Sequence, residues 1–460
     1  MDDRNWYLRN LVVGAEEEVP LADGLYVTGI NLDNAATTPP FKAVLKEVEA
    51  FIPWYSSVHR GTGYKSIVSS DIYEAGRDRI KEFVGADKNQ DIVIYTKNTT
   101  EAINLLANML AEEKEDETIV LSTCMEHIAN DLPWRDTFRT EYIQIDACGV
   151  LVLDDLECKL KKYCGKVKLV TVTAASNVTG YKNPIHEIAK LSHNYGARIM
   201  VDGAQLVPHA PVSMKGRTEA EKIDFLVFSA HKMYAPFGMG ALIGPKTFFE
   251  RCRPVFTGGG AVKLVSTEFV KWDEAPYKHE PGTPNVIGLV ALAAAIRTLS
   301  GVGMENVDRW EQELIEYTLE GLAAIPSLKL YCNPQRGTDR IGIAVFSIPG
   351  IHHRLLAKIL AGEAGIAVRS GLFCAHPYVE RLLGLKKEEL EHYKNNSDQP
   401  IPGLVRASLG MYNRYQEIDT LLDCLDWIVK HKKECVEKYQ HLHMTRVRGE
   451  NGYVYRRETP

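Results

Sequence analysis

The sequence of 460 residues contains no Cys-x-x-Cys pair, and its nine cysteines are scattered between Cys124 and Cys435. Zinc sites and disulfide frameworks use cysteines in even numbers at recurring spacings, so this pattern disfavours both and is typical of a reducing compartment. We therefore expect a cytoplasmic protein without a metal site, in which most cysteines are small inert hydrophobes.

Long apolar runs and an excess of charge are also missing. The longest apolar run, residues 286–296, is too short to span a bilayer, and its alanines are typical of a buried helix. Residues 1–4 do not form a basic region followed by an apolar core, so no secretory signal is expected. The net charge is −6, and the basic stretch 446–457 is short and mixed with acids, which indicates a solvated tail. We expect no membrane and no nucleic acid as a partner.

Short apolar runs alternate with helical patterns over residues 31–296. The clearest runs are residues 91–95, 118–121, 168–172, 198–201 and 225–228. Nearly continuous apolar runs are typical of strands that are covered on both faces. Their alternation with helices, such as residues 185–195, predicts an α/β domain around a mainly parallel sheet.

The pattern changes after residue 301 and indicates a second, smaller α+β domain. Helices are predicted at 304–324, 352–364 and 416–439, and strands at 328–330 and 342–346. Residues 386–399, rich in Lys, Glu and Asn, predict an exposed helix followed by a flexible loop. The expected organisation is an N-terminal segment that packs with the small domain (1–30), a large domain (31–301), a small domain (302–445) and a tail (446–460).

Polar residues follow the ends of several predicted strands. Ligands of such sheets bind beyond the carboxyl ends of the strands, so residues 96–100, His127, Asn177, Asp202 and Lys232 can meet at a single site. A lysine that can form a Schiff base and an aspartate that can hold a pyridinium proton are what pyridoxal phosphate chemistry requires.

Each of these two residues also has a structural interpretation. Asp202 ends a buried strand and needs a partner there, which is either a turn that it caps or a pyridinium N–H. Lysines usually lie on the surface, but Lys232 directly follows a strand, behind Ser229 and His231, and this position favours a buried amine. A histidine at position 127 is more often structural than catalytic, unless a ring must be stacked.

The start of the helical pattern at residues 96–104 indicates a phosphate site. Free backbone N–H groups, the helix dipole and the hydroxyls of Thr99 and Thr100 suit a phosphate. The alternative is a threonine N-cap with Glu101 close behind it, but the position after a strand favours the phosphate. Cys374 is the only cysteine in a glycine-containing polar loop, residues 369–374, so it is the candidate nucleophile.

A set of motifs in a fixed order carries a family resemblance from about Leu32 to Tyr412. They are Leu32-Asp33-Asn34-Ala35-Ala36, Val58-His59-Arg60-Gly61, Thr99-Thr100-Glu101-Ala102-Ile103-Asn104, Glu126-His127-Ile128-Ala129-Asn130, Ser176-Asn177-Val178-Thr179-Gly180, Val201-Asp202-Gly203-Ala204-Gln205, Ser229-Ala230-His231-Lys232, Gly282-Thr283-Pro284-Asn285 and Arg406-Ala407-Ser408. The chain resembles the class V aminotransferase group of fold-type I pyridoxal phosphate enzymes, and within it the group II cysteine desulfurases and selenocysteine lyases.

The resemblance implies a role for each matched residue. Lys232 is expected to form the Schiff base and shuttle protons, His127 to stack on the cofactor ring, and Cys374 to accept sulfur. The residues expected to hold the cofactor are Asp202 at the pyridine nitrogen, Gln205 at the phenolic oxygen, and Thr99, Thr100, Ser229 and His231 at the phosphate, with Thr283 reaching in from the other subunit of a homodimer. The residues expected to contact the substrate are His59, Asn177, Arg369 and Arg406, of which Asn177 and Arg406 bind its carboxylate.

These expectations amount to a cysteine desulfurase that converts L-cysteine to L-alanine and leaves a persulfide on Cys374 for a sulfur-acceptor protein. Two features depart from the resembled group: Leu372 and Phe373 replace polar residues, often histidines, before Cys374, and the segment from Cys374 to Arg406 is longer. The alternatives are a selenocysteine lyase, a C–S lyase, an epimerase or aminotransferase of the same fold, and a cofactor-binding scaffold without turnover.

Overall fold

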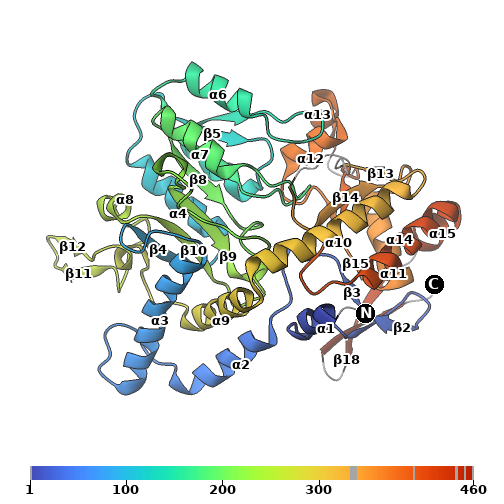
Figure 1. Ribbon diagram of the computed structural model, residues 1–460, viewed down its shortest axis with the longest axis horizontal. Coiled ribbons are helices and arrows are strands. Elements are labelled where there is room, and N and C mark those ends of the chain that lie inside the picture. The colour runs from blue at the N-terminus through green and yellow to red at the C-terminus, as the bar shows by residue number, and fades with distance from the viewer. Residues whose placement is uncertain (1–2, 332–338, 397–398, 441–443, 450–451, 458–460) are drawn as a thin grey trace.

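The computed structural model of the protein describes residues 3–331, 339–396, 399–440, 444–449 and 452–457 (Figure 1). A seven-stranded sheet in the order β4-β10-β9-β8-β7-β5-β6 forms the centre of the large domain. Its strands are β4 Asp91–Thr96, β5 Ile119–Thr123, β6 Arg139–Ile143, β7 Val167–Thr173, β8 Arg198–Asp202, β9 Phe225–Ser229 and β10 Gly240–Pro245.

The five predicted strands are confirmed, and the sheet is mainly parallel as expected. Strands β9, β8, β7, β5 and β6 pair in parallel, and β10 pairs antiparallel with both β9 and β4. Strands β6 and β10 were not predicted. The first is an edge strand with one fully buried residue, Ile143, and the second contains Gly240, Gly244 and Pro245, which are depleted in strands.

Both faces of this sheet are covered, which explains the continuous apolar runs. Met200 and Phe225 face a cluster that contains the buried side of α4 (Thr99–Ala111). Their neighbours Ile199 and Leu226 face the opposite cluster, together with α7 (Ile185–Asn194). The alternation of side chains along each strand therefore divides the core into two layers.

The strand directions bring the polar strand ends to one edge. Because β10 is antiparallel to both β4 and β9, these two strands run the same way. The last residues of β4, β5, β7, β8 and β9 are Thr96, Thr123, Thr173, Asp202 and Ser229. Five polar side chains thus end neighbouring strands at the edge where the sequence predicts a site.

The second domain is built on an antiparallel sheet in the order β13-β14-β17-β16. Its strands are β13 Lys329–Leu330, β14 Ile343–Ser347, β17 Leu404–Ser408 and β16 Arg369–Gly371. The domain boundary expected after residue 301 lies in the last turn of α9 (Val286–Val302), which Gly303 separates from α10 (Met304–Ala324) with a φ of +87°. The helix α9 is largely buried, as expected for its alanine-rich stretch.

The prediction of one helix over 416–439 is wrong, because the helix is broken at His431. Helix α14 covers Tyr415–Lys430, and α15 covers Lys432–Gln440. No glycine or proline marks the break in the sequence. Both helices pack on α11 (His353–Ala364), so tertiary packing rather than local propensity sets the turn.

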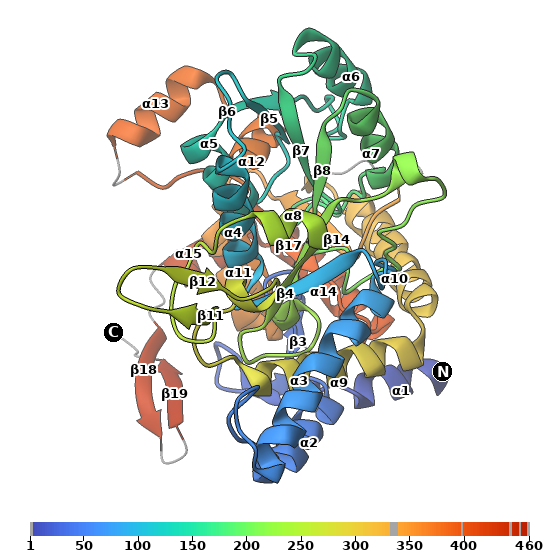
Figure 2. The ribbon, with the colours of Figure 1, turned by 90° about the vertical axis from the view of Figure 1, so that its left-hand side faces the viewer.

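The N-terminal segment runs beside the second domain. Strand β3 (Ile30–Asn31) pairs in parallel with β15 (Ile366–Ala367), and Arg9 Nη1 lies 2.7 Å from Glu417 Oε1 of α14. The other N-terminal elements are α1 Asp3–Asn10, β1 Glu18–Pro20 and β2 Tyr26–Thr28. Within the region expected as a tail, β18 (Met444–Gly449) and β19 (Gly452–Arg457) form an antiparallel hairpin, which Figure 2 shows at the lower left.

Two helices occupy the long segment between Cys374 and Arg406. Helix α12 covers His376–Leu383, and α13 covers Lys387–Asn395. No residue of α13 is buried, which confirms the predicted exposed helix, and Figure 2 shows it standing out from the body of the protein. Residues 397 and 398 of the loop predicted to be flexible lie outside the described residues.

The remaining elements complete the two layers. They are the helices α2 Lys42–Phe51, α3 Tyr64–Phe83, α5 Leu132–Thr137, α6 Leu153–Lys162 and α8 Lys246–Arg251, and the hairpin strands β11 Val262–Val265 and β12 Val270–Trp272. In the described part of the chain, no single helix has the length and apolarity needed to cross a membrane. Helices α9 and α10 would do so only as a pair, and they are bent by 75°.

Candidate active site

Lys232 and Asp202 lie together at the carboxyl edge of the large sheet. Lys232 ends the 3₁₀ turn Ala230–Lys232 that follows β9, and Asp202 ends the neighbouring strand β8 with 4% of its surface exposed. Burial lowers the pKa of the Lys232 amine to about 8, and the charge of Asp202 opposes this shift. Burial raises the pKa of Asp202. A nucleophilic amine therefore faces a buried carboxylate, as pyridoxal phosphate requires.

The structure separates the two structural interpretations, which were a surface position for Lys232 and a turn cap for Asp202. Lys232 is not a surface lysine, because it is partly buried and interacts with Asp202. Asp202 does cap a turn, since Ala204 N donates to its Oδ1 at 2.9 Å.

Gln205 donates from Nε2 to Ala35 O at 2.8 Å, while its buried Oε1 has no hydrogen-bond partner among the described residues. A buried oxygen without a donor is costly, so this atom fits a ligand that carries a hydroxyl, such as the phenolic group of the cofactor.

His127 stands beside Lys232 and is held by its own turn. Ala129 N donates to His127 Nδ1 at 3.1 Å. Burial, followed by the charges of Lys232 and Arg406, lowers the pKa of this imidazole to about 4. The ring is therefore neutral near pH 7, as suits stacking on a flat, electron-poor cofactor.

Glu126 supports this turn, a role that the motif Glu126-His127-Ile128-Ala129-Asn130 does not reveal by itself. The carboxylate is 2% exposed and accepts from Thr123 Oγ1 at 2.5 Å, from Thr173 N at 2.9 Å and from Asn130 Nδ2 at 2.6 Å. Burial raises the pKa of Glu126 to about 8, although these three donors act against the shift. The side chain thus ties the ends of β5 and β7 to the turn that carries His127.

The residues predicted to hold a phosphate gather at the start of α4. The N-cap is Asn98 rather than a threonine, because its side chain accepts from Glu101 N at 2.9 Å. Thr99 N donates to Ser229 Oγ at 2.8 Å, and the two hydroxyls lie 2.7 Å apart. Thr100 is exposed in the first turn, where free N–H groups suit a phosphate.

His231 lies on the same short turn as Lys232, one residue before it. Its Nδ1 lies 3.3 Å from Thr37 Oγ1. Burial and the charge of Lys232 lower the pKa of the His231 ring to about 4. A neutral imidazole can still donate one hydrogen bond to a phosphate oxygen.

Arg406, on β17, faces the site from the second domain. It is 3% exposed, and its Nη1 donates to Asn177 O at 2.8 Å. Its buried Nε has no hydrogen-bond partner among the described residues, and burial lowers its pKa to about 10. A buried guanidinium with a free donor fits a ligand carboxylate.

Asp33 is a second residue whose role is not predicted from the sequence. Its carboxylate bridges two arginines, with Oδ2 at 3.0 Å from Arg369 Nη2 and Oδ1 at 3.2 Å from Arg406 Nη2. A carboxylate between two cations holds both guanidinium groups close together. Asp33 lies in the motif Leu32-Asp33-Asn34-Ala35-Ala36, but nothing in the local sequence shows which residues its carboxylate contacts.

Cys374 is exposed and lies near Lys232 and Arg406, both of which interact electrostatically with it. The backbone carries it in a left-handed conformation, with φ of +51° at both Phe373 and Cys374. This region costs about 1–2 kcal/mol per non-glycine residue, so other contacts must hold the loop. One is the hydrogen bond from Ile128 N to Cys374 O at 2.7 Å.

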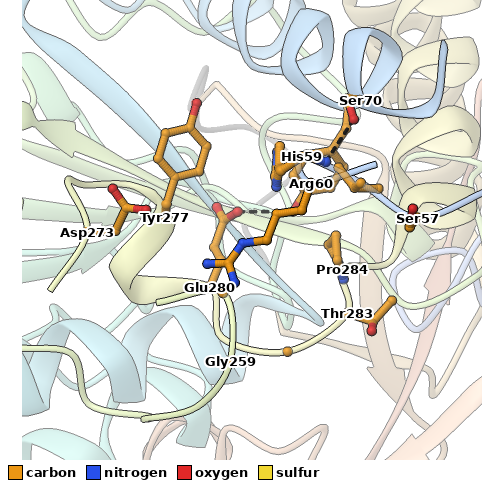
Figure 3. Close-up of a pocket in the computed structure, with 14 residues that line it drawn as sticks. Ser57, His59, Arg60, Ser70, Gly259, Asp273, Tyr277, Glu280, Thr283 and Pro284 are labelled. Carbon is orange, nitrogen blue, oxygen red and sulfur yellow. Dashed lines mark hydrogen bonds between the residues drawn. The ribbon is translucent and has the colours of Figure 1, made fainter. Parts of the chain in front are cut away.

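His59 and Thr283 lie elsewhere, around a cavity of about 770 Å³. Figure 3 shows both residues at this cavity together with Arg60. His59 Nε2 lies 2.8 Å from Glu74 Oε1, and Thr283 is exposed. Neither Lys232 nor Asp202 lines this cavity, so the fold of the single chain does not gather His59 and Thr283 with the other predicted site residues.

Comparisons with known proteins agree over most of the chain. The family model described as Aminotransferase class-V matches residues 30–421. The chain is 36% identical to a probable cysteine desulfurase of Synechocystis sp. over 414 residues, which cover 87% of this chain and 91% of that protein. It is 35% identical to a cysteine desulfurase of Haloferax volcanii, covering 86% of this chain and 88% of that one.

Solved structures give the same result. The apo structure of a cysteine desulfurase from Thermococcus onnurineus superimposes with a TM-score of 0.78 at 32% identity, covering 87% of this chain and 95% of that one. A cysteine desulfurase from Escherichia coli, solved with an S-sulfonic acid, gives a TM-score of 0.75 at 27% identity with the same coverage.

The lowered pKa of Lys232 generates a test on the cofactor-free protein. Only the neutral amine attacks an aldehyde, so covalent loading of pyridoxal phosphate should accelerate with rising pH and level off above about pH 8. Loading is trapped by borohydride reduction and followed by mass spectrometry. Lys232→Ala is the control and should gain no covalent adduct. A rate that keeps rising beyond pH 10, as for an ordinary lysine, would contradict the burial of this amine.

Proposed function

Because the chain belongs to the aminotransferase class-V family, we propose that it is a cysteine desulfurase that uses pyridoxal phosphate to convert L-cysteine to L-alanine. The observation that carries this proposal is the meeting of Lys232, Arg406 and Cys374 at one sheet edge. An amine that activates, a cation that binds a carboxylate and a thiol that accepts sulfur are the three groups that this reaction needs. The relatives that carry the name cysteine desulfurase cover most of the chain.

The residues at the edge of the sheet fit the cofactor. Asp202 would hold the proton of the pyridine nitrogen, Gln205 Oε1 would accept a hydrogen bond from the phenolic hydroxyl, and His127 would stack on the ring. The phosphate would lie at the N-terminus of α4, where Thr99, Thr100, Ser229 and His231 supply polar groups. When bound, pyridoxal phosphate draws electrons away from the α-carbon of an attached amino acid.

The protein's own groups carry the remaining steps. Arg406 binds the substrate carboxylate and thereby orients the α-carbon toward Lys232. The neutral Lys232 Nζ takes the α-proton. Cys374, as the thiolate, then attacks the substrate sulfur.

Sulfur transfer leaves the atoms balanced. A bond forms between Cys374 Sγ and the substrate sulfur, the C–S bond breaks, and its electron pair stays on the β-carbon. Protonation of that carbon and return of the α-proton from Lys232 to the α-carbon give alanine, and a persulfide stays on Cys374. The exposure of Cys374 leaves the terminal sulfur open to a sulfur-acceptor protein, and the cysteines of the described residues are free, as in a cytoplasmic protein.

A homodimer would complete the site. His59 and Thr283 border a cavity apart from Lys232, so they can serve catalysis only from a second subunit. Exposed apolar side chains gather on the neighbouring β11–β12 hairpin and its turn, namely Leu264, Val265, Phe269 and Val270. Apolar side chains in such number on one hairpin are typical of a surface that another chain covers.

Substitution of Cys374 separates the desulfurase from a lyase that shares the fold. Cys374→Ala should keep the absorbance of the bound cofactor but lower alanine formation from L-cysteine at least about 100-fold, because no other nucleophile accepts the sulfur. Mass spectrometry should find no persulfide. Cys158→Ala, which removes another exposed cysteine, is the matched control. Turnover of L-cysteine by Cys374→Ala at the unaltered rate would establish a lyase instead.

Mixed dimers test the shared site. A subunit with Lys232→Ala should pair with a subunit that carries both His59→Ala and Thr283→Val, and each homodimer should be nearly inactive. The mixed dimer then contains one site with all three residues intact, so about half of the activity of the unaltered dimer should return. Native mass spectrometry measures the pairing. No recovery in confirmed mixed dimers, or an active monomer, would refute shared sites.

A further inference from the structure

Phe373 links the proposed sulfur acceptor to the proposed carboxylate binder. The guanidinium carbon of Arg406 lies 5.2 Å from the centre of the Phe373 ring, which is 9% exposed. This distance allows a cation–π interaction, which is stronger when water is excluded. The ring therefore covers one face of the arginine, while Asp33 and Asn177 O bind its edges.

The backbone around Phe373 is fixed on the large domain as well. Phe373 O accepts from Asn177 Nδ2 at 2.7 Å, and Cys374 O accepts from Ile128 N at 2.7 Å. Ile128 directly follows His127. The loop therefore contacts both the carboxylate-binding side and the cofactor-stacking side of the site.

The chain after Cys374 is also anchored. Ala375 is fully buried, and Tyr378 of α12 donates from its hydroxyl to Gly149 O at 2.6 Å. The Tyr378 hydroxyl also lies 3.0 Å from Thr179 Oγ1. Cys374 is thus an exposed residue between two buried neighbours, in a backbone conformation that neither phenylalanine nor cysteine adopts readily.

We propose that Phe373 is a positioning residue that holds Cys374 in register with the substrate carboxylate by stacking on Arg406. This inference rests on the proposed desulfurase activity and assigns a role to Phe373 of the apolar pair Leu372-Phe373. The edge of the Arg406 guanidinium then binds the substrate carboxylate, while its face contacts Phe373 and so positions the thiol of Cys374. The distance between the thiol and the substrate sulfur is set by this shared contact rather than by collisions of a mobile loop.

Substitutions that keep or remove the aromatic ring test the stacking. Phe373→Leu keeps an apolar side chain but loses the ring, so the rate of persulfide formation in a single turnover should fall about tenfold. The KM for L-cysteine should change less than twofold, because Asp33 and Asn177 still hold Arg406. Phe373→Tyr and Phe373→Trp should restore most of the rate. Leu372→Met is the matched control, with an apolar change one residue away and no ring contact.

The cofactor-free protein gives a readout that does not depend on turnover. Amide hydrogen exchange of residues 370–376 should speed up in Phe373→Leu and stay near the unaltered rate in Phe373→Tyr and Leu372→Met. The alkylation rate of Cys374, followed on its own peptide, should change in the same order. Equal rates for the leucine and tyrosine variants in these two measurements would overturn the proposal. Turnover of L-cysteine by Cys374→Ala would instead refute the proposed function, and the exchange data would still report whether the ring holds the loop.

Discussion

The site depends on compensating charges that the fold removes from water at one sheet edge. Asp202 and Arg406 are each at most 4% exposed, and an isolated charge in such a place is prohibitively costly. The protein meets this constraint with paired groups, namely Lys232 beside Asp202 and Asp33 beside Arg406. At the same edge, the buried Glu126 carboxyl has a raised pKa of about 8 and is held by three hydrogen-bond donors. The order and direction of the strands make this pairing possible, because they place five polar strand ends at the same edge of the sheet. Loop lengths, turns and the approach of the second domain then serve to complete these pairs.

The two domains contribute different halves of the chemistry. The large domain supplies every group that fits the cofactor, since each of them follows a strand of its sheet or begins α4. In the proposed reaction, the second domain supplies Arg369, Cys374 and Arg406, which would contact the substrate. Asp33 lies where the chain enters the large domain, yet it binds both arginines. The relative position of the two domains therefore depends on the Asp33 carboxylate, which binds both arginines. A shift between the domains would separate the Cys374 thiol from the Lys232 amine.

The parts that could be predicted are those with a local signal. Continuous apolar runs revealed the central strands, and the rule that ligands lie beyond strand ends brought Lys232 and Asp202 together. Strand β10 was not predicted because it contains two glycines and a proline, which are uncommon in strands. The helix break at His431 has no local cause in the sequence. Asp33 and Phe373 could not be assigned roles for a different reason. Their partners lie far away in sequence, in β16 and β17, so only the folded chain shows the contact.

The left-handed backbone at Cys374 has an evolutionary consequence. Glycine adopts a φ of +51° without the steric penalty that cysteine suffers there. A glycine at this position would relax the loop and raise the stability of the protein while deleting the proposed nucleophile. Thermodynamic stability and reactivity therefore make opposite demands on one residue. A screen of variants for thermostability alone would therefore select Cys374→Gly, unless sulfur transfer were selected at the same time.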